Sequence, residues 1–182
     1  ITAISQPGLE RILFFDIEHL NELGDLCRKR LIVEIMGKHS NIIFCDDKDK
    51  ILDSIKHVSA QMSSVREVLP GRDYFLPQTQ EKQDPLTITE EVFKESVCKK
   101  PCNIAKAIYT TLTGISPLIA EEICYRASID GSDAAQSLDE NAATHLYHTF
   151  HRLIEQVQEG DFTPNIIYRE DEPVEYAVLP LT

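Results

Sequence analysis

Residues 34–41 hold the most varied set of chemically useful side chains in the sequence. The stretch reads Glu34-Ile35-Met36-Gly37-Lys38-His39-Ser40-Asn41. Gly37 permits a positive φ or a close approach of the backbone to a ligand. The four residues after it offer the ammonium, imidazole, hydroxyl and amide groups that bind a phosphate or a ribose. Composition alone also fits an ordinary hairpin turn, so a binding role and a purely structural role both stay open.

A second candidate is the turn Gly114-Ile115-Ser116, which directly precedes Pro117. Ser is a favoured N-cap and Pro a favoured first helical residue, so this order predicts that a helix begins here. The first turn of a helix leaves backbone N–H groups without intrahelical partners, and such groups bind anions. The alternative is a helix corner that serves only for packing.

The sequence offers none of the usual catalytic or metal-binding sets. It has no G-x-S-x-G nucleophile motif, and its 7 glycines do not form a phosphate-binding loop. His145, His148 and His151 recur every three residues, so on a helix with about 3.6 residues per turn they rotate away from one another. Cys98 and Cys102 lack the spacing of a zinc or redox pair. We therefore expect no enzyme activity, no metal and no cofactor.

Charge is distributed unevenly along the chain. The net charge of −12 argues against nucleic-acid binding, because phosphate contacts require Lys and Arg. Residues 1–106, however, contain 15 of the 18 Lys and Arg against 17 acidic residues, a net charge of −2, which leaves −10 for residues 107–182. Any phosphate-binding surface should therefore lie in the first part.

The sequence gives no sign of export or of membrane insertion. No apolar run reaches the roughly 18 residues of a membrane span. The first residues lack the basic start and apolar core of a signal peptide. The five cysteines are odd in number and loosely spaced, which is typical of reduced thiols. We expect a cytoplasmic protein with no membrane contact.

Short apolar runs predict an antiparallel sheet in the first half of the chain. Strands are expected at residues 11–17, at 31–36, from 41 onward and at 51–58, joined by turns that contain Gly or Asp. Short connections between consecutive strands are typical of an antiparallel meander. Residues 59–87 contain several prolines and are expected to form an irregular crossing loop.

After residue 87 the apolar period changes to that of helices. Helices are expected from the N-cap Thr89, over 103–113, from Pro117 and over 138–159, with Gly114 and Gly160 as C-terminal stops. Residues 164–168 and 174–179 are expected to pair as a closing hairpin. The predicted fold class is α+β, with an antiparallel β part at 1–87 and a helical part with the hairpin at 88–182.

Four segments follow one another along the sequence: Gly8–Ile12, Val33–Ile43, Asp53–His57 and Val68–Gly71. In this order they resemble the N-terminal domain of the NFACT family, which includes RqcH (also called fibronectin-binding protein A, FbpA), NEMF and Caliban. The run at 34–41 is the longest and most specific of them. The resemblance covers nearly the whole chain.

The resemblance implies a function in ribosome-associated quality control. Members of the family bind large ribosomal subunits, and hence rRNA, that are blocked by a stalled peptidyl-tRNA complex. They recruit tRNA and promote C-terminal tailing of the nascent chain, with alanine in bacteria. The ribosome's own peptidyl-transferase centre makes the bonds, which agrees with the lack of catalytic residues in this sequence.

The resemblance also implies a fold and a set of binding residues. The family domain is similar to that of formamidopyrimidine-DNA glycosylases, with a β-sandwich followed by a helix-two-turns-helix unit whose second turn matches Gly114–Ile123. An Asp-Arg pair engages tRNA in the family. It matches Glu10 and Arg11 here, where Glu10 departs from the usual Asp and extends the carboxylate by one methylene. Because the family's first strands precede Ile1, we expect the β part to be partly open, or completed by another chain.

Two other functions remain as alternatives. A glycosylase-like DNA-repair enzyme would need a nucleophilic amine and a basic cleft, against which the acidic second half argues. A surface adhesin that binds fibronectin, as an older family name suggests, would need an export signal or a wall anchor. We therefore expect Glu10, Arg11 and residues 34–41 to form an RNA-binding surface, with Gly114, Ile115 and Ser116 as a possible anion site.

Overall fold

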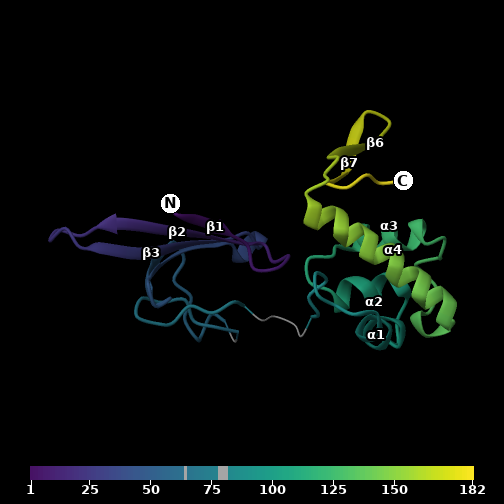
Figure 1. Cartoon of the computed structure of the whole chain (residues 1–182), viewed down its shortest axis with the longest axis horizontal. Coiled ribbons are helices and arrows are strands. Elements are labelled where there is room, and N and C mark those ends of the chain that lie inside the picture. Colours follow the sequence, from purple (N-terminus) through teal and green to yellow (C-terminus); the bar gives the residue numbers. More distant parts are fainter. Residues whose placement is uncertain (64, 78–81) are drawn as a thin grey trace. The chain divides into compact units, whose positions relative to one another are not determined.

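The computed structural model describes residues 1–63, 65–77 and 82–182, and it divides into two compact units. These are Ile1–Glu81, which contains a five-stranded sheet, and Lys82–Thr182, which contains the helices. Figure 1 shows both units in the colours of the sequence. The predicted α+β class with an antiparallel sheet is confirmed.

The sheet of the first unit is an antiparallel meander in the order β1-β2-β3-β4-β5. Its strands are β1 (Ala3–Ser5), β2 (Ile12–Leu20), β3 (Leu26–Glu34), β4 (Asn41–Asp46) and β5 (Ile51–Ser54). β2 and β3 are nine residues long, longer than expected, because cross-strand hydrogen bonds continue through the polar residues 18–28. Asn21 closes the turn between them by accepting hydrogen bonds from the N–H groups of Leu23 and Asp25.

One face of the sheet forms the core of this unit. Alternate residues of a strand point to the same face, and here they bury an apolar cluster. A long segment, residues 55–63 and 65–77, covers this face and is called the strap below. Its members Val58 and Tyr74 pack against the cluster, and Val68 is part of it. The cluster consists of Ile12, Ile32, Ile43, Cys45, Ile51 and Val68.

The expected β-sandwich is not formed by the described residues of this unit. Over residues 1–63 and 65–77 the structure contains one sheet. The strap pairs only through isolated bridges, Val58 with Val68 and Lys50 with Asp73, so it does not build a second sheet. The prolines in the strap explain this in part, since they lack the N–H group that a ladder requires.

The helical unit packs four α-helices around an aromatic core. They are α1 (Glu90–Phe93), which continues as a π-turn over Lys94–Cys98, α2 (Ile104–Thr111), α3 (Pro117–Arg126) and α4 (Glu140–Glu159). Phe93 and Phe150 stack with their ring centroids 5.0 Å apart. Each helix begins at a residue whose side chain accepts a hydrogen bond from a backbone N–H three residues later, a stabilising arrangement. These caps are Thr89, Asn103, Ser116 and Asp139.

Residues 82–87 belong to the helical unit, although the sequence analysis assigned them to the β part. The N–H of Gln83 donates to the carbonyl of Thr111, and the N–H of Thr113 donates to that of Gln83. These bonds hold Leu112 in an extended conformation at the end of α2. Gly114 has a φ of 75° but is therefore not the C-cap that was predicted.

The last part of the chain follows α4, which ends at Gly160 with a φ of 70°, as predicted. β6 (Asn165–Arg169) and β7 (Glu172–Ala177) form a separate antiparallel pair beyond the end of α4 (Figure 1). The Asn165 amide donates to the carbonyl of Leu179, which is buried. Among the described helices, none combines the length and the apolar character that a bilayer crossing requires.

Candidate nucleic-acid interface

The register of the sheet brings the predicted binding residues to one end of it. Ile12 at the start of β2 pairs with Glu34 at the end of β3, and Glu34 pairs with Asn41 at the start of β4. Just beyond this row, the N–H of Ile35 donates to the carbonyl of Arg11 over 2.8 Å. Arg11 and the turn at 35–40, which are distant in the sequence, are therefore neighbours.

The turn at 35–40 is closed by its own hydrogen bonds. Gly37–His39 form a single 3-10 turn in which Gly37 has a φ of 57°, a conformation that other L-residues adopt only with strain. The hydroxyl of Ser40 accepts from the N–H of Met36 over 2.9 Å, and the N–H of Ser40 donates to Gly37. The side chains of Lys38 and His39 are exposed and therefore available to a ligand.

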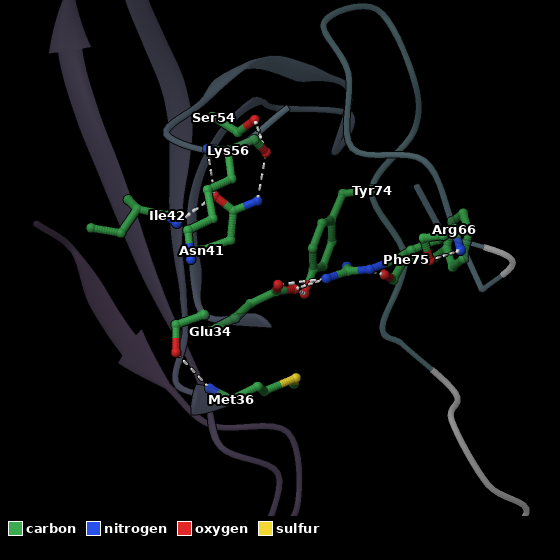
Figure 2. A network of polar contacts seen from close by, with 11 residues as sticks. Glu34, Met36, Asn41, Ile42, Ser54, Lys56, Arg66, Tyr74 and Phe75 are labelled. Atoms are coloured by element: carbon green, nitrogen blue, oxygen red, sulfur yellow. Dashed lines mark hydrogen bonds and ion pairs between the residues drawn. The ribbon is translucent and has the colours of Figure 1, made fainter. Parts of the chain in front are cut away.

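Glu34, expected among the RNA-binding residues, is buried beneath this turn. Only 1% of it is exposed, and both carboxylate oxygens accept from the Arg66 guanidinium at 2.5 Å. The hydroxyl of Tyr74 donates to the same carboxylate over 3.0 Å, and Figure 2 shows the three side chains pointing toward one another. Burying a carboxylate is costly unless it is paired and hydrogen-bonded, and this network meets that need. Glu34 is thus an internal residue that RNA cannot touch in this fold.

Asn41 is also buried and serves the fold. Its side-chain oxygen accepts from the N–H groups of Ile42 and Lys56, each at 3.0 Å, and its amide donates to the carbonyl of Lys56 over 2.9 Å. In Figure 2 its side chain points toward the residues after β5. β5 ends at Ser54 instead of continuing to residue 58, and just beyond it the Asn41 side chain binds both backbone groups of Lys56.

Four cationic or titratable side chains gather around the turn. They are Arg11, Lys38, His39 and Lys56, called the basic corner below, and all four are exposed. The Lys56 ammonium donates to the carbonyl of Lys38 over 3.3 Å, which places the Lys56 side chain beside the Lys38 backbone. No salt bridge joins Arg11, Lys38 or Lys56 to a carboxylate of the described residues.

The other arginines of this unit contrast with the basic corner. Arg28 pairs with Glu18, Arg30 with Asp16 and Asp49, and Arg72 with Glu67. Their charge is therefore largely neutralised within the protein, whereas the positive charge at the basic corner is directed to solvent. Beside it, the His57 imidazole lies 2.8 Å from Asp53, and its hydrogen bond lowers the pKa of that carboxyl.

Of the remaining predicted residues, some lie at the surface of the turn and others pack inside the fold. Ile35 is 54% exposed and lies at the surface of the turn, whereas Met36 packs against the core cluster. Glu10 is half-buried, and its carbonyl accepts from the Gln6 side chain over 2.7 Å. Glu10, which directly precedes Arg11, therefore lies at the same end of the sheet but is less accessible.

The second predicted site, Gly114-Ile115-Ser116, lies in the helical unit. Ile115 is buried and anchors the turn, while Gly114 and Ser116 are exposed. The Ser116 hydroxyl accepts from the N–H of Ile119 as the cap of α3. The backbone N–H groups of Gly114 and Ile115 find no acceptor among the described residues, which leaves them available to an anion.

Sequence reasoning missed three residues of this region. Lys56 was placed on a strand, and nothing local shows that it returns to Lys38. Arg66 and Tyr74 lie in the predicted irregular loop, 32 and 40 residues after Glu34. A signal was present, however: a Glu in an otherwise apolar strand, LIVEIM, requires a buried cation or a break in burial.

As a whole, the basic corner can bind phosphates by charge and hydrogen bonding. Arg presents a planar set of donors that suits a phosphate, and Lys adds a compact charge. The exposed Ile35 offers an apolar contact for a base or a sugar beside them. The described residues contain no group of three or more His, Cys, Asp and Glu side chains that could hold a metal ion.

Comparisons with known proteins identify relatives of this chain. The family model "NFACT N-terminal and middle domains" matches residues 1–182. The Rqc2 homolog RqcH of Bacillus subtilis is 40% identical over 167 residues, which make up 91% of this chain and 27% of that protein. The archaeal Rqc2 homolog aRqcH of Methanocaldococcus jannaschii is 26% identical over 179 residues, 94% of this chain and 24% of that protein. The chain thus spans about a quarter of the length of these relatives.

Solved structures give the same result. The fibrinogen-binding protein of Staphylococcus aureus matches all of this chain and 62% of its own with a TM-score of 0.80 at 30% identity. The N-terminal part of the fibronectin/fibrinogen-binding protein of Streptococcus suis matches 100% of this chain and 59% of its own with a TM-score of 0.73, also at 30% identity. On the match over its whole length, the chain belongs to the NFACT family.

Proposed function

We propose that this chain supplies an RNA-binding surface of an RqcH-like quality-control factor, and that the basic corner is the part that grips tRNA or rRNA. The observation that carries the proposal is the gathering of unpaired cations at one end of a sheet whose other arginines are neutralised by carboxylates. In a chain of net charge −12, such a concentration directs a polyanion to one place.

The relatives named RqcH support a role in ribosome quality control. We propose that the complete protein binds obstructed large ribosomal subunits in the cytoplasm, recruits tRNA and supports alanine tailing of the stalled chain. In this proposal the chain contributes binding rather than catalysis. The likeness of its fold to formamidopyrimidine-DNA glycosylases remains a prediction, as does the anion site at Gly114, Ile115 and Ser116.

The test is a charge reversal at the corner in the full-length protein. Arg11→Glu should reduce the tRNA and large-subunit RNA that copurify with the protein by at least about tenfold, because a repulsive charge replaces a phosphate contact. The slope of log K against log salt for purified tRNA should fall by about one per lost contact. The circular dichroism spectrum of Arg11→Glu must match that of the unmodified protein, so that a loss of RNA is not a loss of folding.

A matched control is Lys48→Glu. Lys48 is exposed in the turn after β4, and six strand residues at about 3.3 Å each place it roughly 20 Å from the corner. The same change of charge there should leave RNA recovery within about twofold, because salt screening limits the interaction between exposed charges to distances of roughly 8–10 Å. Equal losses from both variants, or none from Arg11→Glu, would contradict the proposed role of the corner.

Fibronectin or fibrinogen binding is a second proposal, favoured by the names of the two solved relatives. It predicts saturable binding of the full-length protein to immobilised fibronectin that Arg11→Glu leaves unchanged. Recovery of the protein chiefly in the cell-wall fraction would support it over the first proposal.

A further inference from the structure

Two polar residues are buried in the described part of the β unit, and they stand on either side of the exposed turn. They are Glu34 and Asn41, which are 1% and 4% exposed. They are also cross-strand partners in the register of β3 and β4. The chain therefore passes a buried polar anchor as it enters the turn at 35–40 and another as it leaves.

The Glu34 anchor depends on the strap. Arg66 binds both carboxylate oxygens, and it also donates to the carbonyl of Phe75 over 2.9 Å. The guanidinium carbon of Arg66 lies 5.4 Å from the centre of the Tyr74 ring, whose hydroxyl completes the shell of Glu34. Figure 2 shows that both side chains reach Glu34 from the segment opposite the sheet.

Disturbing this network would change the position of Arg11 relative to Lys38 in the basic corner. A buried carboxylate that loses its cation must regain water or a proton, and a shift of the end of β3 toward solvent would allow this. The N–H of Ile35 is bonded to the carbonyl of Arg11, and Lys38 follows three residues later. A displacement at Glu34 therefore changes the distance between the Arg11 and Lys38 charges, although neither residue touches Arg66.

We propose that Arg66 and Tyr74 are positioning residues for RNA: through Glu34 they clamp the end of β3 and hold the basic corner at the spacing that binds phosphates. The inference rests on the proposed RNA-binding function of that corner. It assigns the acidic residue of the 34–41 motif an internal role. Binding groups generally have to be held to within roughly 0.5 Å, which gives such a clamp a functional consequence.

The same sheet contains a second, more exposed arginine network that does not support the turn at 35–40. Arg30 donates to Asp16 over 2.7 Å and to Asp49 over 2.9 Å, and it lies 5.2 Å from the centre of the Phe14 ring. Arg30 precedes Glu34 by four residues on β3, so alternation places both on the strap-facing side. It differs from Arg66 in lying away from the corner, where it pairs with Asp16 of β2 and Cys45 of β4 in the sheet register.

The test compares Arg66→Met with Arg30→Met in the full-length protein and includes Arg66→Lys as the conservative counterpart of Arg66→Met. Binding of a purified tRNA and hydrogen exchange of the amides at 36–40 are measured together. Arg66→Met should weaken tRNA binding about tenfold and speed exchange at 36–40 about tenfold, since it leaves a buried charge unpaired. Arg66→Lys should restore a large part of both. Arg30→Met should lower the melting temperature but leave both readouts within about twofold.

Equal loss of tRNA affinity from Arg66→Met and Arg30→Met would overturn the clamp, as would native affinity in Arg66→Met. If Arg66→Met does not fold, Tyr74→Phe replaces it, because this change removes a single hydroxyl. It should weaken tRNA binding about threefold to fivefold, less than Arg66→Met does, because Glu34 keeps its cation and loses one hydrogen bond. Unchanged binding would overturn the clamp equally.

A failure of the proposed RNA-binding function can be told apart from a failure of the clamp. If Arg11→Glu has no effect on tRNA, the basic corner is not the RNA site. Exchange at 36–40 would still report in that case whether Arg66 holds the turn.

Discussion

At the scale of single residues, burial separates two roles that look alike in the sequence. Lys38 and His39 are exposed, whereas Glu34 and Asn41 are buried a few residues away. All four are polar, and each is a residue type whose side chain can bind RNA. Alternation along β3 and β4 turns Glu34 and Asn41 toward the core, and the 3-10 turn between them turns Lys38 and His39 outward.

Glu122 is a second buried acid, and it leads to a prediction about pH. It is 4% exposed, and burial by itself raises the pKa of its carboxyl. Hydrogen bonds from Arg126 over 2.6 Å and from the N–H and hydroxyl of Thr182 over 3.1 and 2.8 Å outweigh burial, so the pKa is lowered below 4.5. A lowered pKa means that the folded state binds this proton less readily than the unfolded chain. The ionised carboxylate therefore stabilises the fold above about pH 4.5, and this contribution disappears as the pH falls through the lowered pKa.

The substitution Glu122→Gln should lower the melting temperature at pH 7 by several degrees and have a smaller effect at pH 3. Thermal unfolding followed by circular dichroism at several pH values measures this difference. Glu159→Gln, at an exposed residue at the end of α4, serves as the control and should have little effect at any pH. A constant difference between Glu122→Gln and the unmodified chain from pH 3 to pH 7 would contradict the assignment.

At the scale of elements, local patterns predicted where helices start better than where strands end. The caps Thr89 and Ser116 and the stop at Gly160 were predicted, because a cap acts over three or four residues that are adjacent in the sequence. β5 was predicted to continue to residue 58, but it ends at Ser54, and beyond it the side chain of Asn41 on another strand binds Lys56. Strand boundaries depend on such partners, which a local pattern does not contain.

The role of Asn41 predicts a loss of stability on substitution. Asn41→Ala removes three hydrogen bonds and leaves both backbone groups of Lys56 without this partner. We expect a loss of about 2–4 kcal/mol in the free energy of unfolding, given about 1 kcal/mol per bond and a penalty for buried unpaired groups. The midpoint of urea unfolding measures it. Asn21→Ala, in the exposed turn between β2 and β3, should cost less, and equal losses would show that burial of Asn41 adds nothing.

At the scale of the whole molecule, the β unit has one covered face and one open face. Opposite the core, Leu13, Val33 and Ile42 form one cross-strand row, and Phe15, Leu31 and Phe44 form another. These side chains remain partly exposed. Contiguous apolar surface of this kind is typically covered by further residues or by another molecule.

The open face predicts that the 182-residue chain self-associates. Val33→Lys, at the centre of one row, should reduce both the fluorescence of the dye ANS and the association seen by sedimentation velocity. Leu23→Lys is the control, since Leu23 is 87% exposed at the tip of the β2–β3 hairpin and belongs to neither row. A chain that is monomeric and does not bind ANS would contradict this view of the face.

The sequence by itself determined the fold class, most helix starts, the family and the position of the exposed turn, because each is encoded in residues adjacent along the chain. Only the tertiary structure decided which residues of the 34–41 motif face outward. The same holds for Lys56, which joins the corner, and for Arg66 and Tyr74, which support it. The physical reason is that a buried charge is stable only beside its partner, and that partner lies 32 residues away in the sequence.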